Sequence, residues 1–300
     1  MSKVAELFGI STTVPPKEKD WKLDWKDIVE KRWCPFLTRL CLKNRKSNPE
    51  ILIGTCTVMY GRAQRAIIIC PHRLLERRQI FTDCLHLLTL HEPGNEIHIV
   101  PEISIPGGSV DYFLASVHKR KVKDFVGIEL QTLDTTGTVW PERQRFLREV
   151  GLPAQKEDVD CQDGFGMNWK MTAKTILVQL HHKVETFESI NKHLVLVVQD
   201  CLIDYMRENF VFEHIKEARL GDSMHIHAYQ LERTNSDWQI QLSSRFSTDV
   251  AGVSRSLGLQ ANAKVELETI VAMLEEKISN STLFNFANPV SDVTATTEPS

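Results

Sequence analysis

Two acidic residues, Asp111 and Glu129, stand 18 positions apart on two segments whose patterns predict β-strands. Each carboxylate interrupts an otherwise apolar strand, where an ionised group is costly unless it is paired or binds a metal ion. Two adjacent strands that each carry one inward carboxylate near the strand end form a site for a hard divalent cation such as Mg²⁺. Metal-assisted hydrolysis of phosphodiesters uses such a site to hold the phosphate, generate hydroxide and stabilise the leaving oxygen.

Gln131 follows Glu129 by two positions, so the two side chains project from the same face of one strand. The side chain of Leu130 between them points into the core, while its carbonyl oxygen can face the metal. The amide of Gln131 would orient the attacking water or the phosphate, but it does not titrate and is no general base. The alternative interpretation is an exposed strand edge with solvated acids, and the apolar neighbours of Glu129 favour a buried sheet instead.

Cysteines form the second group of residues that could do chemistry. Four of them lie near the N-terminus, at Cys34, Cys41, Cys56 and Cys70. Four thiolates bind a soft cation in tetrahedral geometry and connect short segments that lack a core of their own. The spacing is wider than the two-residue knuckle of ordinary zinc ribbons, so buried structural cysteines are an alternative of equal weight. The other three lie on apolar patterns and are expected in the core: Cys84, Cys161 and Cys201.

Two histidine pairs carry less weight. His225 and His227 are two positions apart on a strand and could both face one cation, but no third ligand is evident. Satisfied surface histidines are the favoured interpretation of that pair. His181 and His182 are adjacent on a helix, point to different sides and are interpreted as incidental.

Charge is distributed unevenly along the chain. The net charge is −3, yet the stretch from Lys31 to Arg78 holds eleven Lys or Arg and two acids, a net +9, which leaves −12 elsewhere. A basic block in an acidic chain indicates a surface that faces nucleic acid. A solvated basic face without a partner is the alternative, and charge alone does not choose between them.

Composition places the chain among ordinary globular proteins, with 42% hydrophobic and 25% charged residues. Its 300 residues suffice for one large domain or two modest ones. No segment approaches the roughly 18 uninterrupted apolar residues of a membrane span, and the N-terminus lacks the layout of a signal peptide. We therefore expect no membrane association, a cytoplasmic location and reduced thiols.

Hydrophobic periodicity predicts the elements that position these residues. Residues 1–20 are expected to form an irregular arm, and residues 21–71 short elements around the four cysteines. The elements predicted after them are a helix from Pro71 to about Leu90, strands over 96–105, 109–117 and 124–133, a helix from Trp140, a helix over 168–189, a strand over 194–198, a helix over 201–209, β-structure over 223–248 and a helix near 264–279. This order predicts an α/β protein with a mixed central sheet flanked by helices.

A resemblance to a known family adds to this interpretation. The segments PGGSVDY (106–112), ELQTLDTTGTVWPER (129–143) and CLKNRK (41–46) resemble the NotI family of type II restriction endonucleases, over about residues 1–150. The resemblance implies the PD-(D/E)XK nuclease fold, whose helix, three strands, helix and strand agree with the predicted order. It implies Asp111 and Glu129 as Mg²⁺ ligands. Two positions depart from the superfamily pattern: Val110 stands in place of proline and Gln131 in place of lysine.

The resemblance also implies a domain organisation and further ligands. With it we divide the chain into an N-terminal arm and four-cysteine module at 1–71, an endonuclease domain at 72–287 and a tail at 288–300, which is expected to be disordered because it has almost nothing to bury. The module would hold iron rather than zinc, in a structural role because four thiolates leave no position for water; S₄ geometry itself suits either metal. A third acid joins such sites from the first strand or the helix before it. Glu96 and Glu102 are the candidates, and the resemblance favours Glu96; a solvated turn acid at 96 or a surface strand residue at 102 is an alternative of equal weight.

The implied function is site-specific cleavage of double-stranded DNA by a homodimer, at a GC-rich palindrome with a CGGCCG core, beside a companion DNA methyltransferase. A two-fold enzyme matches the two equivalent scissile phosphates of a palindrome. Guanine is best read by Arg or Lys, and the candidate readers are Arg39, Lys43, Arg45, Arg62, Arg65, Arg73, Arg77 and Arg78. The rival interpretations are a non-catalytic, metal-stabilised DNA-binding protein and a structure-selective repair nuclease on the same fold.

Overall fold

The computed structural model describes residues 2–12, 24–45, 48–234, 237–257, 271 and 275–276. The chain divides into two units, Met1–Leu259 and Gln260–Ser300, and the fold below is that of the first. The predicted boundary between residues 71 and 72 falls inside this unit and stays a prediction. Within the predicted helix near 264–279, residues 271, 275 and 276 are helical. The rest of that helix and the tail at 288–300 lie outside the described residues.

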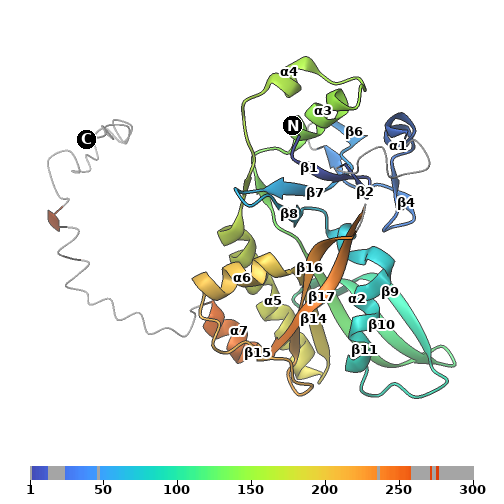
Figure 1. Cartoon of the computed structure of the whole chain (residues 1–300). Coiled ribbons are helices and arrows are strands. Elements are labelled where there is room, and N and C mark those ends of the chain that lie inside the picture. The colour runs from blue at the N-terminus through green and yellow to red at the C-terminus, as the bar shows by residue number, and fades with distance from the viewer. Residues whose placement is uncertain are drawn as a thin grey trace, which may run out of the picture. The chain divides into compact units, whose positions relative to one another are not determined.

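A seven-stranded mixed sheet forms the centre of the unit, in the order β15-β17-β16-β14-β11-β10-β9 (Figure 1). Its strands are β9 (Glu96–Ile105), β10 (Gly108–His118), β11 (Lys121–Gln131), β14 (His193–Gln199), β15 (Lys216–Glu217), β16 (Met224–Thr234) and β17 (Asp237–Thr248). β14 pairs in parallel with β11 and with β16, and the other pairings are antiparallel. The prediction of an α/β protein with a mixed central sheet is confirmed.

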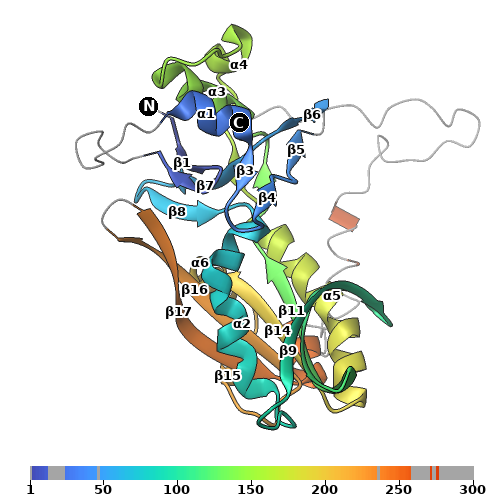
Figure 2. The same ribbon diagram turned by 90° about the vertical axis from the view of Figure 1, so that its right-hand side faces the viewer.

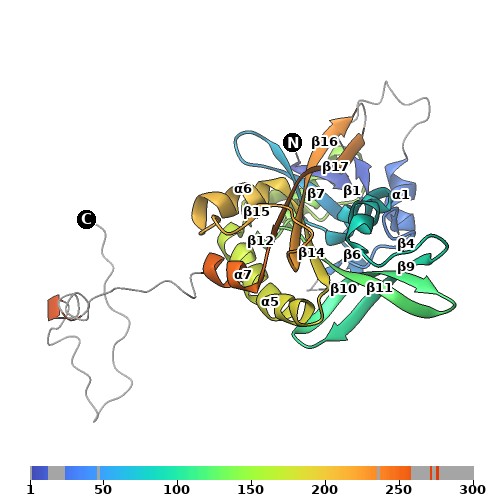
Figure 3. The same cartoon turned by 90° about the horizontal axis from the view of Figure 1, so that it is seen from below.

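Helices cover both faces of this sheet (Figures 1, 2 and 3). One face packs on α5 (Trp169–Ser189), α6 (Asp200–Asn209) and α7 (Val250–Ser256), and the other on the 3₁₀-helix η1 (Pro71–Arg78), α2 (Gln79–Cys84) and the 3₁₀-helix η2 (Leu85–Leu87). The central strand β14 explains this layering. Leu194, Leu196 and Val198 face the first cluster, while Val195 and Val197 face the second. An apolar run of this kind is typical of a parallel strand buried on both faces.

One predicted helix is interrupted. The sequence predicts a single helix from Pro71 to about Leu90, but at the end of η1 Glu76 is extended and Arg77 and Arg78 adopt left-handed backbone angles, which separates η1 from α2. The break lets the Glu76 carboxylate accept the main-chain N–H of Ile240 at 2.7 Å. A contact with a strand so distant in the sequence leaves no trace in the helical periodicity.

The N-terminal part forms a second sheet, in the order β2-β1-β7-β8. Its strands are β1 (Val4–Leu7), β2 (Ile10–Ser11), β7 (Thr55–Tyr60) and β8 (Arg65–Ile68). The expected irregular arm is therefore wrong over residues 4–11, where β1 is fully buried. A strand of four residues gives too short a pattern to detect, and its partner β7 lies about fifty residues further along the chain.

Shorter elements complete the unit. Around the cysteines they are α1 (Trp25–Lys31), β3 (Trp33–Cys34), β4 (Arg39–Leu40), β5 (Asn44–Arg45) and β6 (Asn48–Leu52). Between β11 and α5 they are β12 (Thr135–Thr136), α3 (Trp140–Glu149), α4 (Lys156–Asp160) and β13 (Gly166–Met167). Among the described residues, no helix combines the length and apolar composition that crossing a membrane requires.

A buried arginine connects the two sheets. Arg73 on η1 has no exposed surface, and its guanidinium contacts Glu6 of β1 at 2.8 Å and Glu76 at 3.1 Å. It also donates to the main-chain oxygen of Trp238 in β17 at 2.7 Å. Arg73 is therefore wrong as a candidate base reader, because its guanidinium faces the interior.

Candidate metal-binding active site

Asp111 and Glu129 meet at the same end of two adjacent strands. The register of β10 against β11 pairs Tyr112 with Ile128, and the two acids are the next residues in each strand. Asp111 Oδ2 accepts the main-chain N–H of Leu130 at 2.8 Å, and the carboxylate of Glu129 accepts the main-chain N–H of Asp111. The structure thus brings the two predicted carboxylates together, at the strand end where the sequence analysis expects them.

The side chain of Glu129 is mostly buried and lies against a lysine, Lys183. Burial raises the pKa of Glu129 to about 7, the hydrogen bond from Lys183 opposes that rise, and the charge of Asp111 adds to it. Lys183 Nζ lies 2.7 Å from Glu129 Oε1 and also donates to the main-chain oxygen of Ser109. Sequence reasoning missed this lysine. The sequence does contain a sign of its burial: Lys183 stands in the apolar stripe of α5, among the buried residues Leu180, Val184 and Phe187.

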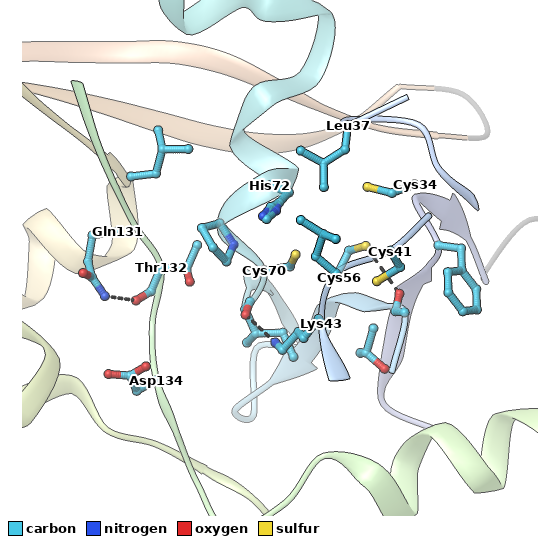
Figure 4. A pocket seen from close by; sticks show the side chains of 17 residues that line it. Cys34, Leu37, Cys41, Lys43, Cys56, Cys70, His72, Gln131, Thr132 and Asp134 are labelled. Atoms are coloured by element: carbon cyan, nitrogen blue, oxygen red, sulfur yellow. Dashed lines mark hydrogen bonds between the residues drawn. The ribbon is translucent and has the colours of Figure 1, made fainter. Parts of the chain in front are cut away.

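Gln131 lies between the acidic pair and the cysteines. Its amide Nε2 donates to the main-chain oxygen of Thr132 at 2.8 Å, as Figure 4 shows. Leu130 and Gln131 line a cavity of about 470 Å³ together with all four N-terminal cysteines. A second, much smaller cavity joins the same two residues to Glu129 and Lys183. The strand end that carries the acids is therefore also one wall of the cysteine cavity.

The register of β9 against β10 shows which of the two candidate acids lies across from Asp111. Val110 pairs with Ile103 and Tyr112 with Pro101, so Asp111 lies across from Glu102. Glu96 pairs with Val117 and makes its ion pair with His98 at 3.3 Å. At a rise of about 3.4 Å per residue, Glu96 is about 20 Å along the sheet from Asp111. The structure does not bring Glu96 to the site. In a hairpin, paired residues are equally far from the turn, which here is at Pro106 and Gly107. Glu96 is much further from that turn than Asp111, so the two cannot be partners.

The four cysteines converge on one cavity from separate elements (Figure 4). They are Cys34 in β3, Cys41 after β4, Cys56 in β7 and Cys70 at the start of η1. All four are buried thiols. The neighbouring Cys56 thiol and the charge of Lys43 lower the pKa of Cys70 to about 6 against the effect of burial, whereas the pKa of Cys56 is raised. Of the four cysteines, Cys70 is therefore the one whose thiolate form is favoured.

The chemistry of this donor set fits a soft metal, but the sulfurs are not yet in a closed tetrahedron. Tetrahedral thiolates lie about 3.8 Å apart around a metal. Within the described residues, the one set of at least three possible ligand atoms all within 4.8 Å of one another is His181, His182 and Glu185 on α5. The four sulfurs are therefore more widely spaced, and a metal would have to draw them together. The side chains of these three α5 residues are at least partly exposed to solvent, and His181 Nε2 is hydrogen-bonded to Ser254 Oγ at 2.7 Å.

Replacement of Cys56 with serine tests the cysteine cluster. We expect the wild type to copurify with a metal bound by the four cysteines, and the variant to lack that metal and to have a Tm lower by about 10 °C, because metal-binding free energy is folding free energy at such a site. Metal content by mass spectrometry and a thermal melt are the measurements. Cys161→Ser, a cysteine outside the cavity, should keep its metal. An unchanged metal content in the Cys56 variant would remove Cys56 from the ligand set.

His72 lies close enough to Arg39, Lys43 and Asp111 for their charges to change its pKa. Burial lowers the pKa of His72, the charges of Arg39 and Lys43 lower it further, and Asp111 raises it. His72 is a second residue that sequence reasoning missed, and it lines the cysteine cavity (Figure 4). Among the other candidate base readers, Arg65 pairs with Asp200 at 2.9 Å. Arg45 stacks on the ring of Trp140 at 4.4 Å.

His225 and His227 are buried, so the interpretation as surface histidines is wrong. They lie on β16 beneath α2, in a strand whose alternating polar residues suggest an exposed face. Burial and the neighbouring His193 lower the pKa of His225 to about 4, and burial and Arg245 lower that of His227 to about 3. Both rings are therefore neutral at physiological pH.

These two histidines should make the protein less stable in mild acid. Their folded pKa values lie below the ordinary value, so the unfolded chain binds more protons between about pH 6.5 and 4, and the free energy of unfolding falls as the pH falls through that window. His227→Phe removes one titrating ring and should abolish about 1.5 kcal/mol of the loss between about pH 6.5 and 5. Urea unfolding of both proteins at the two pH values measures it. Equal losses would show that His227 is protonated in the folded state.

A comparison with models of known protein families finds no match, and a comparison with curated protein sequences finds no similar protein.

Proposed function

We propose that the protein is a Mg²⁺-dependent type II endonuclease that cleaves double-stranded DNA at a specific sequence. The observation that carries the proposal is the meeting of Asp111 and Glu129 at one end of two adjacent strands, with Glu102 across from Asp111. Carboxylate oxygens are the ligands that Mg²⁺ prefers in proteins. Arg39 and Lys43 of the N-terminal part lie close enough to His72 to lower its pKa, and His72 in turn lies close enough to Asp111 to be affected by its charge.

The architecture supports assignment of the core to the PD-(D/E)XK type. A helical segment precedes β9, β10 and β11, and α5 then lies between β11 and its parallel partner β14. This is the helix, three strands, helix and strand order of that fold. Gln131 stands where the motif usually has lysine, and the main-chain carbonyl of Leu130 is the further oxygen that we propose for the metal.

Each residue of the site has a distinct part in the proposed reaction. Asp111, Glu129 and the Leu130 carbonyl would hold Mg²⁺, which supplies Lewis-acid activation of the phosphate and a nucleophilic hydroxide. The hydrogen bond from Leu130 N–H fixes Asp111 on its strand. The Gln131 amide would turn from Thr132 to orient water or phosphate. In the same proposal Cys34, Cys41, Cys56 and Cys70 hold a structural iron, with zinc as the alternative.

The proposed partners follow from symmetry and charge. A homodimer would present two such sites to a palindromic GC-rich target with a CGGCCG core. The candidate base readers other than Arg73 remain, and the exposed ones among them are Arg39, Arg62, Arg65, Arg77 and Arg78. A cytoplasmic location and a companion methyltransferase that protects host DNA complete the proposal.

One observation favours a second candidate, a non-catalytic DNA-binding protein. Asp111 and Glu129 both have N–H partners within the chain, in Leu130 and Lys183. Carboxylates that are satisfied in this way also occur as purely structural pairs. That candidate shares the basic block and the cysteine cluster but predicts no cleavage.

Digestion of a fully sequenced plasmid with and without Mg²⁺, followed by mapping of the ends, tests the function. Discrete fragments that end at one shared sequence, only with Mg²⁺, are the expected result and would also give the target. Cleavage that follows DNA shape would point to a structure-selective nuclease. An intact plasmid that the protein still binds would overturn the catalytic proposal in favour of the second candidate.

A further inference from the structure

The proposed site contains a positively charged side chain that does not belong to the Asp111, Glu129 and Gln131 motif. Gln131 carries no charge, and its amide is bonded to Thr132 of its own strand. The positive charge beside the acids comes instead from Lys183, which reaches Glu129 from α5 at 2.7 Å. We propose that Lys183 is a positioning residue of this site: it holds the Glu129 carboxylate beside Asp111 and supplies the positive charge that Gln131 cannot. The inference rests on the proposed function.

Burial makes this contact strong and specific. The side chains of Lys183 and Glu129 are 10% and 14% exposed, so water screens their attraction weakly. A lysine that is mostly buried is rare unless it is paired. Lys183 also donates to the main-chain oxygen of Ser109, two residues before Asp111. Its ammonium therefore connects the two strands that carry the acids.

The glycine turn before Asp111 makes room for this lysine. A Cβ on Gly107 would lie 2.9 Å from the main-chain carbonyl carbon of His182. A Cβ on Gly108 would lie 3.3 Å from Cε of Lys183. Both glycines have positive φ angles, of 94° and 124°. Side chains at this turn would push α5 away from β10, so the pair of glycines lets the lysine stem pass to Glu129.

The ammonium has two opposing consequences for a metal at the acids. It repels a divalent cation bound at the same carboxylate, so it weakens metal affinity. A fixed positive charge next to the phosphate position stabilises the negative charge that grows there during hydrolysis, so it speeds the reaction. A lysine with a merely structural role would not separate these effects, because its loss would loosen the site and weaken both.

Lys183→Met tests the inference through metal binding and rate together. Mn²⁺ binding to the protein without DNA is followed by electron paramagnetic resonance at about pH 8, above the ordinary range of carboxyl pKa values. Asp111→Asn identifies the signal that belongs to the acidic site. We expect Lys183→Met to bind Mn²⁺ about tenfold more tightly and, at saturating metal, to cut its mapped target about 100-fold more slowly. Lys183→Arg keeps the charge and should restore wild-type behaviour in both measurements.

Lys192→Met is the matched control. Lys192 forms a buried ion pair at 2.6 Å with Asp124, which lies on β11 like Glu129 but away from the two acids. It should change neither Mn²⁺ affinity nor rate. Lys183→Gln, which keeps a donor for Glu129, is measured in parallel in case Lys183→Met does not fold. Unchanged or weaker Mn²⁺ binding in both Lys183→Met and Lys183→Gln would overturn the inference. Tighter Mn²⁺ binding with a wild-type protein that cuts no DNA would refute the nuclease while leaving Lys183 as the cation of the site.

Discussion

Replacement of Asp111 with asparagine is expected to abolish Mg²⁺-dependent cleavage while DNA binding stays intact. The asparagine side-chain oxygen can still accept the Leu130 N–H that Asp111 accepts now, so the strand pair is retained. The variant loses the negative charge that a divalent cation needs. Because bound metal supplies several kcal/mol of transition-state stabilisation, we expect the single-turnover rate to fall by at least about 1,000-fold. Glu129→Gln, which keeps an acceptor for Lys183, should behave alike.

The measurement is single-turnover cleavage of the mapped target, with binding measured in Ca²⁺. Glu96→Gln is the matched control, because Glu96 lies on the same sheet but pairs with Val117 far from the acids. It should cut like the wild type, whereas Glu102→Gln should be slower. Loss of DNA binding together with cleavage in Asp111→Asn would contradict a role confined to the metal. A slow Glu96 variant would contradict the placement of the third acid.

Replacement of Arg73 with methionine is expected to destabilise the protein by about 3–5 kcal/mol, because removal of one partner of a buried ion pair leaves an uncompensated charge. Glu6 is 2% exposed and would lose the guanidinium that offsets the effect of burial, which raises its pKa. Trp238 would lose the donor to its main-chain oxygen. For a domain of this size the loss corresponds to a fall in Tm of about 10–15 °C.

Arg77→Met is the control, because Arg77 follows on the same segment but is exposed. Its stability should stay within about 0.5 kcal/mol of the wild type. Urea unfolding of both variants makes the comparison. The double variant Arg73→Met, Glu6→Leu removes both charges and should recover part of the loss, since hydrophobic replacements of a buried pair are often neutral. Equal stability of the two single variants would show that Arg73 does not hold the sheets together.

Local patterns predict the central elements well. The apolar run of β14 and the helical spacing of α5 are visible in the sequence because each buries a continuous stripe of its own residues. The placement of Asp111 and Glu129 on neighbouring strands follows from the same local reasoning. A site built from two adjacent hairpin strands is close to being a local structure, which is why its two central acids could be proposed from the sequence.

The features that the sequence did not predict all depend on contacts between distant segments. Lys183 reaches Glu129 across 54 positions and Arg73 reaches Glu6 across 67. His225 and His227 look like an exposed face in their own strand, but His193 lies against His225, and Cys84 and His86 lie against His227. β1 is too short to detect, and the break at Glu76 serves a partner in β17. In each case the residue's own segment carries no record of the partner.

The sequence by itself therefore determined the fold class, the main strands and helices, the acidic pair and the four cysteines, because residue type and short-range periodicity are properties of single segments. The tertiary structure alone decided which cation stands beside Glu129, that Glu102 rather than Glu96 lies across from Asp111, that Arg73 faces inward and that the cysteine cavity adjoins the acidic strand. The physical reason is that burial and charge pairing depend on what packs against a residue, and packing brings together segments whose separation along the chain no local pattern encodes.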